Sequence, residues 1–408
     1  MIPHFAVRTD WNTHANDYSL SVQAMRRDAG QVWDLTASNP TVCGFEYDAE
    51  SILTALSRPE GLVYSPEPRG MRAARNAVAQ YYRDAAEAAV DPDRIFLTTS
   101  TSEAYSYLFR LHCNPGEEVL IAQPSYPLFD FLADLNDIRL VSYPLFYAHG
   151  WHLDPAALAA RITPATRAVV VVNPNNPTGN FMQAAERKAL ERICAAHGLA
   201  LIVDEVFLDY SIAPDRPEPF GREVQAQIAA GSRSFACGEQ IALTYVLSGI
   251  SKVAALPQLK AAWIAVLGPE PAVQAAVERL EVIADTYLSM NAPVQHSLPD
   301  VLAGRHKLQR QIRERTRANL DALDSALARQ SLVSRLVIEA GWYAILRIPL
   351  RQREENAAID LMRRERVIVH PGYFYGLPDD PWIVVSLLTG ETEFREGIER
   401  LTNFFNRG

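Results

Sequence analysis

A lysine and an aspartate, each placed directly after or at the end of an apolar run, are the residues best suited to covalent and acid–base chemistry. Lys252 lies in a loop of small residues, SGISK, that follows the run ALTYVL. A lysine in such a loop can be desolvated, which lowers its pKa and makes the amine a usable nucleophile or base. Asp204 ends the run LALIVD, where a buried carboxylate is costly unless it is paired, for example with a cationic ring nitrogen of a cofactor. Taken alone, an exposed lysine and an N-capping or ion-paired aspartate explain the same residues.

Two further polar segments also follow predicted strands. Residues 173–179 read NPNNPTG, and the two Asn-Pro steps with the Thr-Gly step indicate a tight loop. Residues 98–104 read TTSTSEA and join a short strand to a helix. Hydroxyls and free N–H groups at a helix N-terminus can bind an anion. A plain turn and an ordinary helix cap are the alternatives for these two segments.

These segments need a parallel sheet to bring them together. Unbroken apolar runs predict strands buried on both faces at residues 117–123, 167–173 and 199–204. Amphipathic patterns predict helices at residues 102–112, 126–136 and 184–197. The alternation favours a doubly wound α/β sheet, which binds ligands outside the carboxyl ends of its strands.

The last third of the chain has a different pattern. A helical tract is predicted from residue 271 to 330, with interruptions near Ala292-Pro293 and Leu298-Pro299. Strands are predicted at 335–349 and 367–388, and a helix at 391–405. This order indicates a separate α+β portion.

Composition excludes several classes of protein. The 408 residues include 39 Lys+Arg and 48 Asp+Glu, a net charge of −9, which disfavours binding to nucleic acid or to an anionic membrane. No apolar run approaches the roughly 20 residues of a membrane span, and no signal peptide is expected. Four scattered cysteines predict reduced thiols in a cytoplasmic protein. The motifs HExxH, GxSxG and GxxxxGK[ST] are absent, which disfavours metalloprotease, serine-hydrolase and P-loop chemistry.

The order and spacing of the polar segments resemble those of fold-type I pyridoxal-phosphate enzymes, and more closely those of the class I/II aminotransferase family. Asp204 of DEVF follows Asn176 of NPNNPTG by 28 residues, and Lys252 follows Asp204 by 48. With SNPT at residues 38–41, the resemblance covers nearly the whole chain. It implies an α/β fold with a mostly parallel sheet in a large domain, residues 50–290, and a small α+β domain from residues 1–49 and 291–408.

The resemblance implies roles for individual residues. Lys252 would hold pyridoxal 5′-phosphate as a Schiff base and then act as a base, while Asp204 would keep the ring nitrogen protonated. The other implied cofactor contacts are Asn176 at the ring oxygen, Tyr126 on the ring face, Ser100, Thr101, Ser102 and Lys260 at the phosphate, and Tyr64 at the phosphate of a neighbouring subunit. Ser38 and Asn176 would contact the substrate. The implied protein is a cytoplasmic, homodimeric aminotransferase that acts on a small-molecule amino donor and an oxo acceptor.

The chain departs from the family pattern at several of these positions. Phe207 stands where a tyrosine is usual, Gly249 where a serine contacts the phosphate, and Lys260 where an arginine grips it through two hydrogen bonds. The most consequential departure is Val384, which stands where the family has the arginine that clamps the substrate α-carboxylate.

A valine leaves a carboxylate unpaired, so we expect an unusual substrate grip. Arg69 and His370 are the candidate replacements for the missing arginine. The loss also leaves open a pyridoxal-phosphate-dependent lyase or decarboxylase, or a cofactor-binding protein with little activity, because the fold does not fix which bond breaks. Retention of Lys252 and Asp204 favours an active enzyme. The segment before Ser38 is too short for the DNA-binding domain that fold-type I regulators carry.

Overall fold

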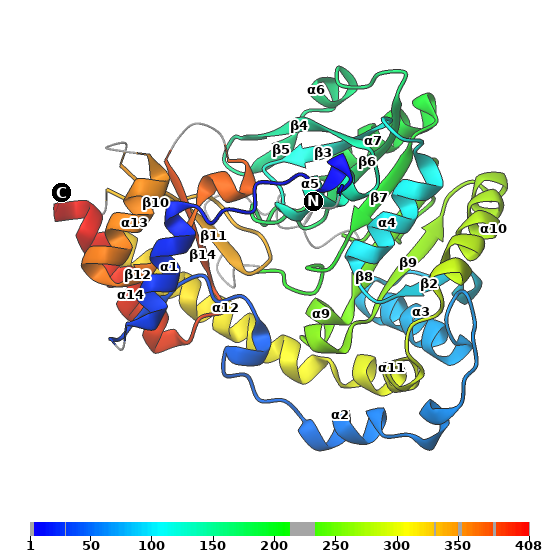
Figure 1. Cartoon of the computed structure of the whole chain (residues 1–408), viewed down its shortest axis with the longest axis horizontal. Coiled ribbons are helices and arrows are strands. Elements are labelled where there is room, and N and C mark those ends of the chain that lie inside the picture. The colour runs from blue at the N-terminus through cyan, green and yellow to red at the C-terminus, as the bar shows by residue number, and fades with distance from the viewer. Residues whose placement is uncertain are drawn as a thin grey trace.

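The computed structural model describes residues 4–28, 30–212, 233–329, 332–349, 353–377 and 381–407. These residues form a large lobe around one long sheet and a small lobe near the C-terminus, seen at the right and left of Figure 1. None of the helices described is both long enough and apolar enough to cross a bilayer.

Among the described residues, eight strands form the sheet of the large lobe in the order β2-β9-β8-β7-β6-β3-β4-β5. Their bounds are β2 Ile95–Thr98, β3 Glu118–Gln123, β4 Arg139–Tyr147, β5 Trp151–Leu153, β6 Thr166–Val172, β7 Ala200–Asp204, β8 Thr244–Gly249 and β9 Ala262–Leu267. The strands from β8 to β4 run parallel, whereas β9 is antiparallel to both its neighbours and β5 forms a hairpin with β4. The predicted α/β fold with a mostly parallel sheet is therefore confirmed.

Helices cover both faces of this sheet (Figure 1). They are α3 Arg72–Ala86, α4 Thr101–His112, α5 Leu128–Leu135, α6 Pro155–Ala159, α7 Ala184–His197 and α10 Glu270–Tyr287. In β6, Val169 and Val171 belong to one apolar cluster with α3 and α7, whereas Val170 belongs to another with α4 and α10. Because successive side chains point to opposite faces, a strand covered on both sides must be apolar throughout.

The small lobe is built on a sheet with the order β10-β11-β14-β13, all antiparallel, and on a separate parallel pair, β1 with β12. The strands are β1 Trp33–Asp34, β10 Ser334–Arg335, β11 Tyr343–Arg347, β12 Val367–Ile368, β13 His370–Pro371 and β14 Trp382–Ser386, and the helices are α1 Asp17–Arg27, α13 Glu354–Glu365 and α14 Glu391–Arg407. One face of β11 and β14 packs on the small-lobe helices. The opposite face contacts Trp151 of the large lobe.

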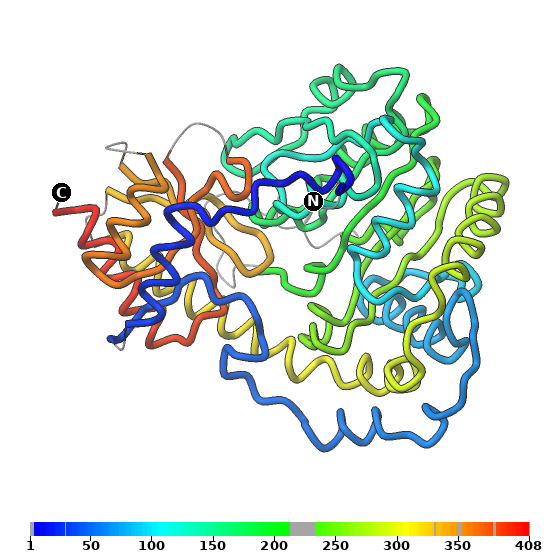
Figure 2. The backbone as a smooth tube through the Cα atoms, viewed as in Figure 1, coloured from blue at the N-terminus to red at the C-terminus, as the bar shows by residue number. Residues whose placement is uncertain are grey.

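Two long segments connect the lobes. The helix α12, His306–Leu327, contributes Leu308 to an apolar cluster beside the large sheet and Leu323 to the small-lobe core. In Figure 2 the N-terminal segment runs from α1 to the large lobe, where the indole of Trp11 donates to Asp134 at 2.7 Å. Since α12 belongs to both lobes, the division of the chain at residue 290 stays a prediction.

The predicted break at Leu298-Pro299 is wrong. A new helix, α11, begins at Ala292 as expected, but it continues to Gly304 with Pro299 inside it. An interior proline costs about 3 kcal/mol. Leu298 and Leu302 are buried in the core with α3, and this burial offsets the loss. A shorter helix, α2 (Ala49–Leu56), packs against the other side of α11.

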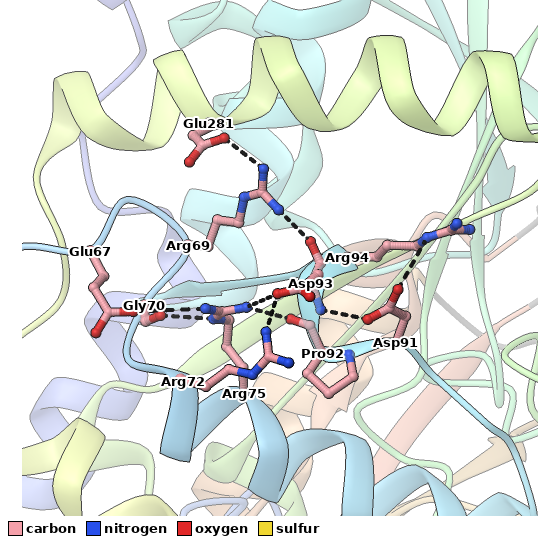
Figure 3. A network of polar contacts seen from close by, with 10 residues as sticks. All are labelled: Glu67, Arg69, Gly70, Arg72, Arg75, Asp91, Pro92, Asp93, Arg94 and Glu281. Atoms are coloured by element: carbon pink, nitrogen blue, oxygen red, sulfur yellow. Dashed lines mark hydrogen bonds and ion pairs between the residues drawn. The ribbon is translucent and has the colours of Figure 1, made fainter.

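A buried arginine fixes the segment that enters α3. Arg75 donates to the carbonyl oxygens of Gly70 and Pro92 at 2.8 and 2.7 Å and to the carboxylate of Asp93 at 3.2 Å (Figure 3). Pro92 and Asp93 belong to the 3₁₀ turn η4, Pro92–Arg94, directly before β2. Arg75 is thus the centre of a junction between the start of α3 and the start of β2.

We expect Arg75→Ala to lower the free energy of unfolding by about 2–4 kcal/mol, because it removes the donor to the carbonyl oxygen of the buried Gly70 and one of the two donors to that of Pro92. The matched control is Arg72→Ala, which removes an exposed arginine that pairs with the same Asp93. That change should cost under about 1 kcal/mol. Urea denaturation followed by tryptophan fluorescence measures both, and equal losses would contradict the assignment.

Candidate active site

The polar segments singled out in the sequence lie at one edge of the large sheet (Figure 1). They directly follow or end the strands β2, β3, β6, β7 and β8, whose carboxyl ends share this edge because the strands run in the same direction. The antiparallel β9 begins at the same edge, just after Lys260. This is the edge at which open parallel sheets bind ligands.

Asp204 is the last residue of β7 and lies among backbone and hydroxyl donors. The N–H of Val206 donates to its Oδ1 at 3.0 Å, and the hydroxyl of Tyr105 donates to its Oδ2 at 3.1 Å. Burial raises the pKa of Asp204 to about 6, against the opposing effect of these bonds and of Lys252. The carboxylate is therefore mostly ionised at neutral pH.

Lys252 lies on a single helical turn, α9, Ile250–Val253, at the end of β8. Its Nζ lies 4.7 Å from the ring centroid of Trp342 and 5.6 Å from that of Phe207. Burial lowers the pKa of the amine to about 8, while the charge of Asp204 raises it. An amine with this pKa has roughly two to three hundredfold more of its unprotonated form at neutral pH than an ordinary lysine. The structure thus brings together the two residues on which the sequence argument depends.

The loop after β6 is tied to the small lobe. Gly179 has a φ of 70°, and a Cβ there would lie 2.4 Å from the carbonyl oxygen of Ala340. Only glycine fits such a turn and such a close approach. Within the described residues, Oδ1 of Asn176 is buried without a hydrogen-bond partner, as are the hydroxyls of Ser125 and Ser248. Buried polar atoms of this kind are normally satisfied, so a polar ligand at this edge would complete them.

The helix cap at residues 98–104 is present, and it leaves free donors. Oγ of Ser100 accepts from the N–H of Glu103 at 3.1 Å, and the carboxylate of Glu103 accepts from the N–H of Thr99 at 2.6 Å. Across the described ranges, no hydrogen bond occupies the N–H groups of Thr101 and Ser102 in the first turn of α4. Capping and anion binding are therefore compatible in this segment.

Strand register places Gly249 and Lys260 near this helix end. Ala262 of β9 pairs with Thr98 of β2 on one side and with Gly249 of β8 on the other. Lys260 lies two residues before Ala262 and is exposed. A Cβ at Gly249 would lie 2.9 Å from the carbonyl oxygen of Ala261, so a serine does not fit there without a backbone shift.

Residues of the small lobe reach the same edge. The N–H of Ser125 donates to the carbonyl oxygen of Tyr375 at 2.9 Å. The hydroxyl of Tyr343 is hydrogen-bonded to Ser38, and Tyr126 lies near enough to influence the pKa of Tyr343. Tyr126 itself is 45% exposed, so one part of its ring is open to a ligand or to solvent.

The position of the missing arginine is apolar. Val384 is fully buried in a cluster with Ile345 and Trp151. His370 pairs with Val384 in the sheet, and its Nδ1 lies 3.1 Å from the hydroxyl of Tyr375. Burial lowers the pKa of His370 to about 4, so the ring is neutral at pH 7. His370 therefore supplies no cation beside Val384.

Arg69 is engaged elsewhere. Its guanidinium donates to the carbonyl oxygen of Asp93 and to Glu281, each at 2.7 Å (Figure 3). Asp93 belongs to η4, before β2, and Glu281 belongs to α10, so the guanidinium is bonded to residues outside the site. Tyr64, in contrast, is 79% exposed beside Leu62 and Val63, and no contact of the described residues joins its ring to the site of its own chain.

Two residues of the site have no clear signal in the sequence. Trp342 contacts Lys252 only because the segment before β11 reaches across from the small lobe. Tyr105 lies one turn into α4, on the face toward the sheet. The position of Tyr105 follows from helical periodicity once Ser100 is recognised as the cap.

We expect Asp204→Asn to lower the pKa of Lys252 below about 8. Asp204, with a pKa of about 6, is ionised where the amine titrates, and its loss leaves burial as the dominant influence. The rate of carbamylation of Lys252 by cyanate, followed by mass spectrometry across pH, measures the shift. The control is Asp209→Asn, since Asp209 is a buried acid that is not among the charges acting on Lys252. An unchanged or raised midpoint in Asp204→Asn would contradict the pairing.

Comparisons with known proteins agree with this geometry. The model of the family described as aminotransferase class I and II matches residues 34–401. The glutamate-pyruvate aminotransferase AlaA of Escherichia coli strain K12 is 26% identical over 289 residues, which are 69% of this chain and 65% of that protein, just under two thirds of its length. The alanine aminotransferase of Mycobacterium tuberculosis strain H37Rv is 26% identical over 390 residues, 93% of this chain and 87% of that protein.

Solved structures show the same fold. The alanine aminotransferase from Pyrococcus furiosus superposes with a TM-score of 0.84 at 19% identity and covers 96% of each chain. A mutant of the aspartate aminotransferase of Thermus thermophilus gives a TM-score of 0.79 at 23% identity, with 98% of this chain and all of that chain covered. The likeness extends over both lobes.

Proposed function

Because this chain belongs to the aminotransferase class I and II family, we propose that it transfers an amino group from an amino donor to an oxo acceptor with pyridoxal 5′-phosphate bound at Lys252. The observation that carries the proposal is the placement of a partly buried Lys252 within the electrostatic influence of the buried Asp204, at the ligand-binding edge of a parallel sheet. The relatives named as glutamate-pyruvate and alanine aminotransferases support the reaction class.

The residues at this edge fit the cofactor. The unpartnered N–H groups at the start of α4, with Lys260 nearby, suit a phosphate. The unpartnered amide oxygen of Asn176 and the partly exposed ring of Tyr126 suit a polar aromatic ring. When bound, pyridoxal phosphate supplies an aldehyde and a ring that withdraws electrons from the substrate.

The side chains of the chain itself supply positioning and proton transfer. Asp204 keeps a negative charge where the ring nitrogen would lie, so a proton on that nitrogen is favoured. Lys252 offers an amine that is deprotonated in a useful fraction of molecules near pH 8. Such an amine would hold the aldehyde of the cofactor, with loss of water, and as a free amine would take up or return a proton at the substrate carbon that bears nitrogen.

The same proposal includes a homodimer and a cytoplasmic location. Tyr64, Leu62, Val63 and Leu53 are exposed in and after α2, and such an apolar surface suits a second subunit. Tyr64 could then complete the phosphate site of its neighbour, as the family resemblance implies. All four cysteines are free, as expected in a reducing compartment.

The substrate grip is the unusual part of the proposal. With Val384 buried among apolar side chains and His370 neutral, the position matched to the family's carboxylate clamp offers no cation. We propose that the α-carboxylate contributes little to recognition, so that amines lacking it are accepted. The same observation keeps a lyase or decarboxylase reaction as the second candidate, because a loosely held carboxylate does not fix which bond at the substrate carbon breaks.

We expect Lys252→Ala to abolish covalent capture of pyridoxal phosphate and turnover. Borohydride treatment of the purified holoenzyme followed by peptide mass spectrometry should find the cofactor on residue 252 of the wild-type protein. The control is Lys260→Ala, which removes a neighbouring lysine and should weaken cofactor affinity while leaving the attachment site unchanged. Fixation on another lysine, or none in the wild-type protein, would refute the proposed site.

We expect a primary amine to retain more than about a tenth of the kcat/KM of the amino acid with the same side chain, because no arginine stands at Val384. In a site built around an arginine that binds the carboxylate through two hydrogen bonds, removal of the carboxylate typically lowers kcat/KM by far more than tenfold. Conversion of the visible cofactor band during single turnover measures each donor of a matched pair, such as phenylalanine and phenethylamine. A preference of a thousandfold or more for the amino acid would contradict the proposed grip.

A further inference from the structure

The helical turn that contains Lys252 is too short to be stable on its own. The helix α9 has four residues, and a single turn is unstable without outside contacts. The last carbonyl oxygens of a helix also lack partners within it. Three side chains from distant parts of the chain donate to carbonyl oxygens at or just after the end of α9: Tyr210 to that of Lys252 at 2.5 Å, Gln309 to that of Val253 at 2.8 Å, and Tyr47 to that of Ala255 at 2.7 Å. Within the chain's own backbone, the carbonyl of Lys252 also accepts from the N–H of Ala255 at 3.1 Å.

The donor to Lys252 itself is the most firmly held of these side chains. Tyr210 is 1% exposed, and burial with the nearby charge of Asp209 raises its pKa well above the ordinary value, so the hydroxyl stays protonated. Gln309 is 2% exposed and also bonds Asp209, which accepts from Tyr81 at 2.9 Å. The main-chain end of Lys252 is therefore fixed by a donor that cannot rotate into solvent.

The amine end of Lys252 is bounded by a residue from a different segment. Trp342 is fully buried, and its ring centroid lies 4.7 Å from Nζ. The same ring meets the rings of Tyr210 and Phe207 edge-on, at centroid distances of 5.1 and 5.2 Å. An ammonium over an indole face is attracted to it, most strongly when both are desolvated.

Backbone pairing keeps Trp342 in this place. The N–H of Gly341 donates to the carbonyl oxygen of Tyr210 at 2.9 Å, and Ser211 forms an antiparallel bridge with Ala340. The residue that bonds the carbonyl of Lys252 is thus paired with the segment that places the indole on its amine. Residues 210–211 and 340–342, which pair with each other, therefore contact both the carbonyl oxygen and the amine of Lys252.

We infer that Tyr210 and Trp342 are positioning residues for Lys252, the phenol fixing its carbonyl and the indole fixing its amine. This inference rests on the proposed role of Lys252 in holding the cofactor. A reacting amine must meet a carbonyl carbon at a defined distance and angle, and a displacement of about 1 Å can cost a hundredfold in rate. Contacts of Lys252 with Phe207, Tyr210 and Trp342 would hold the amine at such a fixed position.

The first test uses apoprotein and pyridoxal phosphate in the wild type, Trp342→Leu and Trp342→Phe. The rate of formation of the bond that borohydride fixes on residue 252 is followed by absorbance and peptide mass from pH 6.5 to 9.5. We expect Trp342→Leu to slow this rate at least tenfold and to lower its pH midpoint by about one unit, because the ring no longer favours the ammonium form. Trp342→Phe, which keeps an aromatic face, should stay within about threefold of the wild type.

A shift in the pH midpoint of attachment can be assigned to the pKa of Lys252, because the charge that acts on this amine is known. Asp204 of β7 is the charged side chain acting on Lys252, and neither Trp342 nor Phe207 titrates. The control for packing alone is Trp263→Leu, since Trp263 is equally buried but packs in a different cluster. It should lower the melting temperature without changing the rate or the midpoint.

The second test compares Tyr210→Phe with Tyr47→Phe, which each remove one hydroxyl from a carbonyl of the same turn. Of these two tyrosines, only Tyr210 bonds Lys252 and contacts Trp342, so Tyr210→Phe should slow cofactor attachment about tenfold and Tyr47→Phe by less than threefold.

If the wild type forms no borohydride-stable bond at residue 252, the proposed function fails and this inference fails with it. If the wild type forms the bond and Trp342→Leu and Tyr210→Phe match it in rate and midpoint, the inference alone is overturned. It is equally overturned if Trp263→Leu shifts both quantities as much as Trp342→Leu does.

Discussion

The site depends on keeping one amine out of water beside one carboxylate. Burial lowers the pKa of Lys252 and raises that of Asp204, and each charge partly corrects the shift of the other. Two opposite charges in a dry environment are stable only if both are held at fixed distances and both keep further partners. For Asp204 these partners are Tyr105 and the N–H of Val206. For Lys252 they are the aromatic rings and the donors that fix its turn.

The need to exclude water from Lys252 and Asp204 explains why the strands that lead to them are apolar. The strand β7, which ends at Asp204, and the strand β8, which ends three residues before Lys252, are buried over their whole length. A parallel strand covered on both faces is mostly apolar, so polar side chains that can bind a ligand gather at and just beyond its carboxyl end. The apolar runs in the sequence therefore predicted the sheet and the location of Asp204 and Lys252 together. The positions of Ser100, Asn176 and Tyr126 at the same edge follow from the same rule.

The sequence could not predict contacts that depend on distant segments meeting. Trp342 and Tyr210 touch Lys252 through pairing between residues 340 and 211, and no local pattern records such a pairing. Pro299 was expected to end a helix because local propensity disfavours it there, yet burial of Leu298 and Leu302 against α3 outweighs that propensity. Roles such as ring stacking by Tyr126 remain predictions, since they concern a group that the chain binds.

The departures from the family pattern are connected by the same packing. A serine does not fit at Gly249 without a backbone shift because the start of β9 lies too close, while the N–H groups of Thr101 and Ser102 and the side chain of Lys260 lie at the same edge. An arginine at Val384 would begin inside the apolar cluster that contains Ile345 and Trp151, where burial of a charge is costly. The contact of Val384 and Ile345 with Trp151 joins the small sheet to the β4–β5 hairpin. An apolar contact between the lobes therefore stands where the family pattern has a charged side chain. Asp204 and Lys252 thus belong to the large lobe, whereas Trp342, beside the amine, and Val384, at the apolar contact between the lobes, come from the small-lobe part of the chain.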